Sequence, residues 1–556
     1  MDTLSLALAQ INPVVGDIEG NVGRILLARA EMADRGADLV VFPELSVCGY
    51  SPEDLVLRPS FLNAVDAAIE QLAAATADGG PAILVGAPLR VEEGLYNAAL
   101  LLDGGKVAAH CFKHELPNYG VFDEMRVFTP GVLSGPIEFR GLRLGIMICE
   151  DMWEPTVAED LGAAGAEILI VLNASPFEAG KRETRRHLAE MRVDETGLPL
   201  VYINQTGGQD ELVFDGASFI LGPDGALRGQ TISFGERLFL TNWRRGETGW
   251  DCDACEMAAD LSEFNAVYSA LVLGLRDYVA KNGFLGILIG LSGGIDSALS
   301  AVIAVDALGA DRVHCVMMPS PYTSRSSLDD AAAVATGLGV RLDTISIQPA
   351  MAAFDDMTKE IFVEHAHDTT EENIQARSRG ITLMALSNKF GFMVLSTGNK
   401  SEMSVGYATL YGDMCGGFSV LKDVYKTDVY ALSRWRNEHR SEGGLGPGGP
   451  GGGVVIPEHV LTRPPSAELK PNQTDQDSLP PYDELDDILK SLIEEDMSLQ
   501  KIIEGGHDEA VVKKVWRMVQ GAEYKRRQAP PGVRVSRRAF GRDRRYPITN
   551  HFRGPS

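Results

Sequence analysis

Short apolar runs alternate with stretches of helical pattern over residues 1 to about 240. The runs that we expect to form strands are residues 4–9, 38–42, 83–86, 142–148, 168–172 and 200–204. The stretches that we expect to form helices are residues 21–35, 61–75 and 183–196. This alternation predicts an α/β layered domain.

A second alternating region begins near residue 261 with a long helical stretch. Its expected strands are residues 284–291, 313–318, 342–347 and 392–396, and its expected helices are residues 261–281, 298–308, 327–338, 349–360 and 373–390. Strands that alternate with helices in this way predict a doubly wound, Rossmann-like parallel sheet. Residues 241–258 are polar and aperiodic, so we expect a first domain over 1–245, a linker over 246–260 and a second domain over 261–556.

A turn rich in Ser and Gly joins the first strand of the second region to the helix that follows it. Its glycines allow a sharp turn with outward N–H groups, and the positive end of the helix adds to their attraction for anions. Its hydroxyls add donors, and its carboxylate is suited to hold Mg²⁺ against a polyphosphate. No Lys follows the glycines, so this is not a Walker loop. The alternative is an ordinary helix cap, but the pattern favours an ATP site formed by Gly290, Leu291, Ser292, Gly293, Gly294, Ile295, Asp296 and Ser297.

Three reactive residues of the first region, Glu44, Lys113 and Cys149, each stand just after an apolar run. The ends of strands are where α/β folds place their chemistry, so these side chains are expected to meet in one site. Cys149 would be the nucleophile and Glu44 the base that takes its proton and later activates water. Lys113 would lower the thiol pKa and stabilise an oxyanion. Each residue alone has an ordinary alternative, a core thiol or a solvated charge.

The length, composition and net charge of the chain limit the classes of protein to which it can belong. The chain has 556 residues, is 45% hydrophobic and 23% charged, and carries 51 Lys+Arg against 77 Asp+Glu, a net charge of −26. Such acidity disfavours general binding to nucleic acid or membranes. No apolar run reaches about 18 residues and the start lacks a basic segment, so we expect a cytoplasmic protein.

The seven cysteines are odd in number and scattered, which does not suggest a disulfide framework. Cys252 and Cys255 have the spacing of half a zinc site. No second Cys or His pair lies nearby in the sequence, so a structural metal is not favoured.

Three segments around the reactive residues resemble the signature regions of nitrilase-type carbon–nitrogen hydrolases. They are Phe-Pro-Glu-Leu at 42–45, the segment 113–126, and Cys-Glu-Asp-Met-Trp at 149–153. The resemblance implies an αββα sandwich and a Glu44–Lys113–Cys149 triad that cleaves an amide through a thioester. It covers roughly residues 4–240.

The segment Leu-Pro-Asn-Tyr-Gly-Val-Phe-Asp-Glu at 116–124 is similar to the glutaminase domain of glutamine-dependent NAD⁺ synthetases. The resemblance implies that Tyr119, Ser175 and Lys181 contact glutamine. It also matches Glu124 to a second, supporting glutamate.

Three clusters of the second region resemble the synthetase domain of the same family: residues 371–377, residues 396–402 running on to 406–413, and residues 523–527. The Ser/Gly turn resembles the loop of enzymes that split ATP into AMP and pyrophosphate. The resemblance implies that Thr397 contacts ATP. It implies that Asn373, Glu402 and Lys525 bind deamido-NAD⁺, and that Asp296 and Glu402 bind Mg²⁺. Taken singly, each cluster could be a capped helix start or a solvated face.

The resemblance implies an enzyme that frees ammonia from glutamine and uses ATP to amidate deamido-NAD⁺ to NAD⁺. It also implies that the chain assembles as a homo-oligomer. One alternative is a nitrilase-like amidase whose second domain senses nucleotide. Others are the amidation of a different carboxylate and a non-enzymatic NAD-binding regulator. The glycine-rich segment 443–453 is expected to form a mobile loop over the synthetase site, either a lid or a tolerated insertion.

Overall fold

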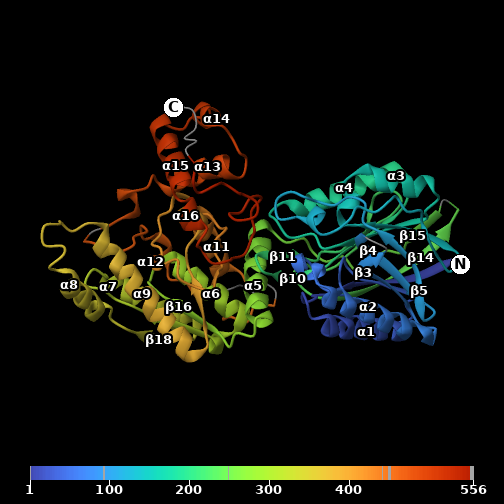
Figure 1. Cartoon of the computed structure of the whole chain (residues 1–556), viewed down its shortest axis with the longest axis horizontal. Helices are drawn as coiled ribbons and strands as arrows, with labels where there is room; N and C mark the ends of the chain where they lie inside the picture. Colours follow the sequence, from blue (N-terminus) through green and yellow to red (C-terminus); the bar gives the residue numbers. More distant parts are fainter. Residues whose placement is uncertain are drawn as a thin grey trace. The chain divides into compact units, whose positions relative to one another are not determined.

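The chain folds as two compact units, Met1–Leu261 and Ser262–Ser556, here called unit 1 and unit 2 (Figure 1). The structure is a computed structural model that describes residues 2–91, 94–247, 249–440, 443–448, 453–471 and 473–550. The segment expected as a linker contains the edge strand β15 (Gly249–Cys252), in which Trp250 is buried. Cys252 is buried as well, but two buried side chains in a four-residue strand gave the sequence pattern little to detect.

Unit 1 is built on two sheets. The first has the order β15-β14-β1-β2-β3-β4-β5 and the second the order β13-β12-β9-β8-β7-β6. The strands of the first sheet are β1 (Thr3–Gln10), β2 (Leu39–Val41), β3 (Ala82–Val91), β4 (Gly94–Asp103), β5 (Lys106–Phe112), β14 (Arg237–Gly246) and β15. Those of the second are β6 (Ile137–Phe139), β7 (Leu142–Ile148), β8 (Ile168–Asn173), β9 (Leu200–Asn204), β12 (Phe219–Leu221) and β13 (Leu227–Gln230), and β10 (Thr206–Gln209) pairs with β11 (Leu212–Asp215).

Helices cover the outer face of each sheet, which makes an αββα sandwich (Figure 1). They are α1 (Ile18–Asp34) and α2 (Pro59–Ala75) on the first sheet, and α3 (Pro155–Ala163) and α4 (Lys181–Thr196) on the second. Leu6 and Leu8 pack between the sheets, whereas Ala7 and Ala9 pack toward the first pair of helices. Side chains of a strand alternate between faces, so each face of β1 has its own apolar cluster.

Unit 2 is built on a parallel sheet of order β18-β17-β16-β19-β20. Its strands are β16 (Ile287–Gly290), β17 (Val313–Met317), β18 (Arg341–Thr344), β19 (Met393–Ser396) and β20 (Phe418–Ser419). The order reverses between β16 and β19, and ligands of such sheets bind beyond the carboxyl ends of the strands at that point. The Ser/Gly turn follows the carboxyl end of β16 and therefore lies at this expected ligand-binding position.

Helices cover both faces of this sheet. Leu288, Val316 and Val394 pack with α8 and α9, while α6 contacts β16 and β17 and packs against α5 and α11. The helices around the sheet are α5 (Glu263–Lys281), α6 (Ile295–Leu308), α7 (Arg325–Leu338), α8 (Gln348–Thr358), α9 (Thr369–Phe390), α10 (Lys400–Val405), α11 (Lys426–Glu438) and α12 (Glu458–Thr462). The predicted fold class, two α/β parts of which the second has a doubly wound parallel sheet, is confirmed.

A group of helices near the carboxyl end forms its own apolar cluster with α10 (Figure 1). It consists of α13 (Tyr482–Ile493), α14 (Leu499–Glu504), α15 (Glu509–Gly521) and α16 (Glu523–Arg526). Apart from Lys525 in α16, the sequence analysis did not single out these helices. The buried positions Leu485, Ile488, Leu489 and Leu492 of α13 nevertheless follow the three- and four-residue spacing of an amphipathic helix.

The described part of the glycine-rich segment does not lie over the phosphate turn. Leu445 N donates to Asp306 O at 2.8 Å, and Arg436 Nη2 donates to Pro447 O at 2.9 Å. Asp306 lies near the last turn of α6, whereas the phosphate turn precedes its first turn. The expected position over the synthetase site is therefore wrong for residues 443–448, while residues 449–452 lie outside the described residues.

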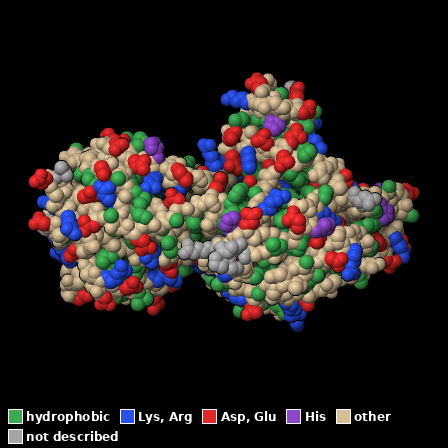
Figure 2. Space-filling model, turned by 180° about the vertical axis from the view of Figure 1, so that it is seen from behind, with side chains coloured by type: hydrophobic (Ala, Val, Ile, Leu, Met, Phe, Trp, Pro, Cys, Tyr) green, Lys and Arg blue, Asp and Glu red, His purple; other side chains and the backbone are tan. Residues whose placement is uncertain are grey.

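Charges of both signs are mixed over the surface. On the face that Figure 2 shows, Lys and Arg side chains are interspersed with Asp and Glu. Within the described residues, no helix is both long enough and apolar enough to span a bilayer.

Candidate active sites

Glu44, Lys113 and Cys149 are almost completely buried, with exposed fractions of 0%, 1% and 4%. Glu44 follows β2, Lys113 follows β5 and Cys149 follows β7, so the first two come from one sheet of unit 1 and the third from the other. The structure places them in one electrostatic cluster, since the charge of each of the other two shifts the pKa of Cys149.

The Lys113 ammonium is the centre of this cluster. Lys113 Nζ donates to Glu44 Oε1 at 2.7 Å and to both carboxylate oxygens of Glu124 at 2.9 Å. Burial acts to lower the Lys113 pKa, but the charges of Glu124 and Glu44 raise it well above the ordinary value. Lys113 is therefore a permanent cation, and Glu124, matched to a supporting glutamate, contacts it directly.

Glu44 is fixed by groups that sequence reasoning missed. Its Oε1 also accepts from Asn97 Nδ2 at 2.7 Å, and its Oε2 accepts from Ala174 N at 3.0 Å. Gly86 of β3 lies against the same turn, where an added Cβ would come within 2.3 Å of Leu45 N. A hydrogen atom at position 86 thus lets the backbone carry Glu44 close to the sheet.

Cys149 begins a short 3₁₀ turn (Cys149–Met152) with φ of 50°, a backbone conformation that residues other than glycine rarely adopt. Strained backbone of this kind persists where the surrounding structure holds it, and it gathers at functional sites. Asp151 supplies that hold, because its carboxylate accepts from Ile148 N at 2.9 Å and from His114 N and Glu115 N at 3.0 and 2.8 Å. Burial raises the Asp151 pKa to about 6.

The sequence predicted that Lys113 lowers the pKa of the Cys149 thiol. The Lys113 charge does act in that direction, but burial and the charge of Glu44 outweigh it and raise the thiol pKa well above the ordinary value. The predicted direction of the Lys113 effect is therefore confirmed, although the thiol pKa as a whole is raised. The resting nucleophile is a neutral thiol, and its proton must leave as the attack occurs.

Tyr119 and Lys181 lie near a carboxylate beside the nucleophile. Tyr119 OH donates to Glu150 Oε1 at 2.8 Å, and Lys181 Nζ stands 5.5 Å from the centre of the Trp153 ring. Burial raises the Glu150 pKa, while the Tyr119 hydrogen bond and the charges of Lys113 and Lys181 oppose that rise. The sequence offered one signal for Glu150, its position directly after Cys149.

Ser175 is buried and already engaged. Its Oγ accepts from Arg185 Nε at 3.0 Å, and Arg185 pairs with Asp215 at 2.7 Å. The structure thus brings Ser175 to the Arg185–Asp215 pair rather than to Tyr119 or Lys181.

A pocket of about 300 Å³ opens at the carboxyl end of the unit 2 sheet. Its lining includes the whole turn 290–297 together with Thr397 and Glu402. Asn373 and Lys525 are absent from that lining, yet both hold the adjoining loop: Thr409 Oγ1 donates to Asn373 Oδ1 at 3.0 Å, and Lys525 Nζ donates to Gly406 O and Ala408 O at 2.7 Å.

The Ser/Gly turn has the expected geometry. Gly293 has φ of 84°, and an added Cβ there would come within 2.3 Å of Ser327 O. Ser292 and Ser297 lie with their Oγ atoms 3.0 Å apart, and Gly294 N donates to Ser292 Oγ at 3.2 Å. The turn therefore stands at the start of α6 with two adjacent hydroxyls, at the helix end that attracts anions.

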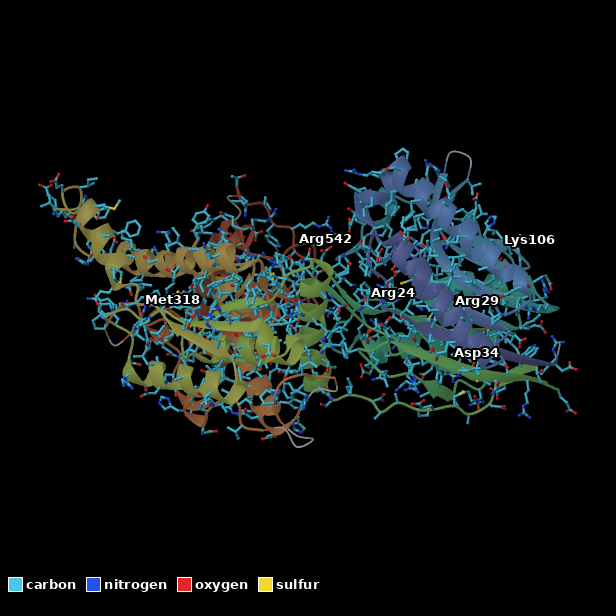
Figure 3. The ribbon with its side chains drawn as sticks, turned by 90° about the horizontal axis from the view of Figure 1, so that it is seen from below. Arg24, Arg29, Asp34, Lys106, Met318 and Arg542 are labelled. Carbon is cyan, nitrogen blue, oxygen red and sulfur yellow. The ribbon has the colours of Figure 1, made fainter. Side chains whose placement is uncertain are left out.

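Two cations of the pocket were not predicted. Lys426, at the start of α11, is buried and contacts two carboxylates of the pocket. Arg379 of α9 donates from Nε to Met318 O at 3.1 Å (Met318 is labelled in Figure 3), and burial lowers its pKa. The sequence carried little signal for either, because Arg379 lies two residues beyond the 371–377 cluster and Lys426 only precedes an ordinary helical pattern.

Asp296 and Glu402 converge on Lys426 Nζ, at 2.5 and 3.2 Å. Burial raises the Glu402 pKa to about 8, and Asp296 and Asp475 add to the rise against the charge of Lys426. One ammonium thus faces three carboxylates, and carboxylates left in excess beside a phosphate turn fit Mg²⁺, which binds through one or two of them plus phosphate oxygens. In the part of the chain that the structure describes, no group of three or more His, Cys, Asp or Glu side chains forms a complete protein cage for a metal.

Two families match the two units. The model described as carbon-nitrogen hydrolase matches residues 5–247, and that described as NAD synthase matches residues 267–529. Fold and sites therefore define a carbon–nitrogen hydrolase joined to an NAD synthase.

Relatives match over the whole length. The chain is 49% identical to the glutamine-dependent NAD⁺ synthetase of Rhodobacter capsulatus and 43% identical to that of Thermotoga maritima, with 100% of each chain covered. A solved structure of the enzyme from Acinetobacter baumannii, in complex with ADP, is 44% identical with a TM-score of 0.78 over 99% of both chains. A structure from Cytophaga hutchinsonii, 22% identical with a TM-score of 0.82 over 99% of this chain and 98% of that one, shares the fold.

The chain belongs to the family of glutamine-dependent NAD⁺ synthetases. The resemblance that the motifs suggested and the predicted class of enzyme are both confirmed.

Proposed function

We propose that unit 1 hydrolyses glutamine through Cys149, Lys113 and Glu44, and that unit 2 uses the released ammonia with ATP to convert deamido-NAD⁺ to NAD⁺. The observation that carries the first half is the 2.7 Å contact between Glu44 and Lys113 in the buried cluster with Cys149. Base, cation and nucleophile share one site there.

The neutral thiol dictates the order of events in unit 1. Glu44 takes the Cys149 proton while Sγ attacks the side-chain amide carbon, so charge passes to the carbonyl oxygen. Lys113 holds a fixed positive charge for that oxygen in a dry site, where it acts more strongly than in water. Ammonia leaves, and Glu44 then directs water onto the thioester to release glutamate.

Tyr119, Glu150 and Lys181 are suited to the other end of glutamine. Glu150 offers a carboxylate to the α-ammonium group, and Lys181 offers an ammonium to the α-carboxylate. Ser175, whose hydroxyl accepts from Arg185, is included because it directly follows Ala174, whose N–H donates to Glu44.

In unit 2 the phosphates of ATP would bind the turn Gly290–Ser297, with Thr397 at the same pocket. Lys426 and Arg379 supply cationic groups, and the dinucleotide would approach beside the loop held by Asn373 and Lys525. Asp296 and Glu402 would hold Mg²⁺, which when bound neutralises charge on the phosphates. The carboxylate of deamido-NAD⁺ attacks the α-phosphate, pyrophosphate leaves, and ammonia replaces AMP on the adenylated carboxylate.

Ammonia near neutral pH is mostly ammonium, which is not a nucleophile. Efficient use of glutamine nitrogen therefore requires a sheltered path between the two sites. A cytoplasmic homo-oligomer that binds neither nucleic acid nor membranes remains our prediction from the sequence.

Omission of each substrate in turn tests this proposal. With glutamine, ATP, Mg²⁺ and deamido-NAD⁺ present, we expect NAD⁺ and AMP in equal amounts, and neither when the dinucleotide or ATP is left out. Glutamate release without any AMP would instead support an amidase with a nucleotide-sensing second unit. AMP formation with another carboxylate but not with deamido-NAD⁺ would indicate a different acceptor.

A further inference from the structure

Cys252 and Cys255 form a close pair of free thiols outside both candidate active sites. Their Sγ atoms lie 3.8 Å apart, and both thiols donate to the same carbonyl, Asp253 O, at 3.3 and 3.1 Å. Cys252 ends β15 and is buried, whereas Cys255 is half-buried. A disulfide bond is about 2.05 Å long, so a small movement of one side chain would join them.

The backbone around the pair is held in place. Asp253 N donates to Asn242 O at 2.9 Å, Cys255 N to Arg228 O at 2.8 Å, and Ala258 N to Gln230 O at 3.0 Å. The two thiols are therefore brought together by the main chain before any reaction, and little further chain entropy is lost on closure.

A groove gives Cys255 access to solvent. The groove lies beside α1 and β14, has a volume of about 1040 Å³, and is lined by Cys255 and by charges of both signs. Arg24 and Asp34, labelled along α1 in Figure 3, are two of these charges, and Arg35, Arg237, Glu236 and Glu256 are others. Mixed charges of this kind suit a small zwitterionic molecule.

We propose that Cys252 and Cys255 form a reversible dithiol–disulfide site that reacts with low-molecular-weight disulfides of the glutathione class. Cys255 reacts first because it reaches the groove, and Cys252 resolves the product from the buried side. When Cys255 loses its proton, the Cys252 S–H can turn from Asp253 O to Cys255 Sγ, and this hydrogen bond lowers the Cys255 pKa and favours the thiolate.

The exchange balances in two steps. The Cys255 thiolate attacks one sulfur of the small disulfide, whose S–S bond breaks, and one thiolate leaves and is protonated. Cys252 then gives up its proton and attacks Cys255 Sγ in the mixed disulfide, and the second thiolate leaves. Two protein thiols are oxidised, and one small disulfide is reduced to two thiols.

Peptide mapping of the full chain tests the proposal without reference to activity, so its outcome is independent of the proposed function. The reduced protein is exposed to glutathione disulfide, denatured, alkylated and digested with trypsin. Cleavage after Arg245 and Arg276 places both cysteines in one peptide. We expect this peptide to be lighter by two hydrogens, to carry no glutathione or alkyl group, and to return to the dithiol with a reductant.

Serine variants separate the two roles. Cys252→Ser should keep one glutathione on Cys255 and release one equivalent of reduced glutathione, half the wild-type amount at this site. Cys255→Ser should leave Cys252 unmodified. Cys415, half-buried in unit 2, is a single-thiol reference in every sample.

Two results would overturn the proposal. One is a wild-type peptide that bears two alkyl groups, or a persistent glutathione adduct, after an exposure that modifies Cys415. The other is Cys252 reacting in the Cys255→Ser variant as fast as the pair reacts in the wild type.

Discussion

The two candidate sites differ in how their positive and negative side chains are balanced. In unit 1 the reactive groups are buried and already paired, with Lys113 between the carboxylates of Glu44 and Glu124. In unit 2 the carboxylates of Asp296, Glu402 and Asp475 outnumber the one ammonium beside them, around a pocket of about 300 Å³. The side-chain amide of glutamine, where the reaction takes place, carries no charge, so the protein must supply the base and the cation around it. Nucleotides bring negatively charged phosphates together with Mg²⁺, so part of the charge balance in unit 2 can come from the bound ligands.

This contrast predicts which half-reaction each substitution removes. The largest effect is expected from Cys149→Ala, which deletes the nucleophile. NAD⁺ formation from glutamine should fall by about a thousandfold or more, because loss of a nucleophile removes the covalent route. Formation from added ammonium should stay within about twofold, which steady-state assays with each nitrogen source would measure. The control is Cys252→Ala, which removes another thiol of unit 1. If Cys149→Ala lost activity equally with glutamine and with ammonium, Cys149 would not act in glutamine hydrolysis alone.

Asp296→Asn should impair the ATP-dependent half-reaction of unit 2. Loss of this carboxylate should reduce AMP formation with either nitrogen source by about a hundredfold or more, since one element of electrostatic stabilisation is removed. Glutamate release should persist, because the unit 1 cluster is untouched. Asp311→Asn, an exposed change beyond the far end of α6, is the matched control. Full AMP formation in Asp296→Asn would show that the carboxylate has no part in ATP chemistry.

Glu150→Gln should weaken recognition of glutamine rather than its cleavage. A hydrogen bond to a charged group contributes about 1.5–3 kcal/mol, so KM for glutamine should rise about ten- to a hundredfold while kcat changes little. A simple amide without an α-ammonium group should be cleaved as well by the variant as by the wild type. Glu154→Gln, at an exposed position of the same segment, should leave KM unchanged. A fall in kcat with KM unaltered would place Glu150 in the chemistry instead.

The smallest effect concerns stability. Burial raises the pKa of Glu402 to about 8, whereas a free glutamate titrates near 4.3, so the folded form holds a proton that the unfolded chain has lost. Stability contributed by this group is present at low pH and is lost as pH rises from about 5 to about 8. Glu402→Gln should therefore lessen the pH dependence of ligand-free unfolding in unit 2 and stabilise it at pH 8 by about 1 kcal/mol or more.

Urea unfolding at several pH values would measure this effect, with the exposed Glu438→Gln as control. A variant whose unfolding free energy falls with pH as steeply as that of the wild type would argue that Glu402 is charged in the free pocket.

The sequence predicted what depends on long periodic patterns and on motifs at strand ends. β7, β8 and β9 appeared as apolar runs, and the Ser/Gly turn and the Glu44–Lys113 contact followed from residues that stand directly after such runs. β15 was missed because it is only four residues long and offers two buried side chains, Trp250 and Cys252, between polar neighbours.

What could not be predicted depends on contacts between distant segments. Asn97 and the Ala174 N–H, which hold Glu44, are 53 and 130 residues from it in the chain. The raised Cys149 pKa likewise results from burial, which a linear pattern does not reveal. Lys426 lacked a motif of its own, and only the fold brings it to Asp296.

The proposed mechanism requires that the nitrogen released at Cys149 is the nitrogen attached to the dinucleotide in unit 2. The most direct measurement supplies glutamine labelled with ¹⁵N in its side-chain amide, an equal concentration of unlabelled ammonium, ATP, Mg²⁺ and deamido-NAD⁺. Mass spectrometry of the product then gives the isotope in the carboxamide of NAD⁺. We predict that most NAD⁺ carries ¹⁵N; NAD⁺ that carries only the unlabelled nitrogen would contradict the claim.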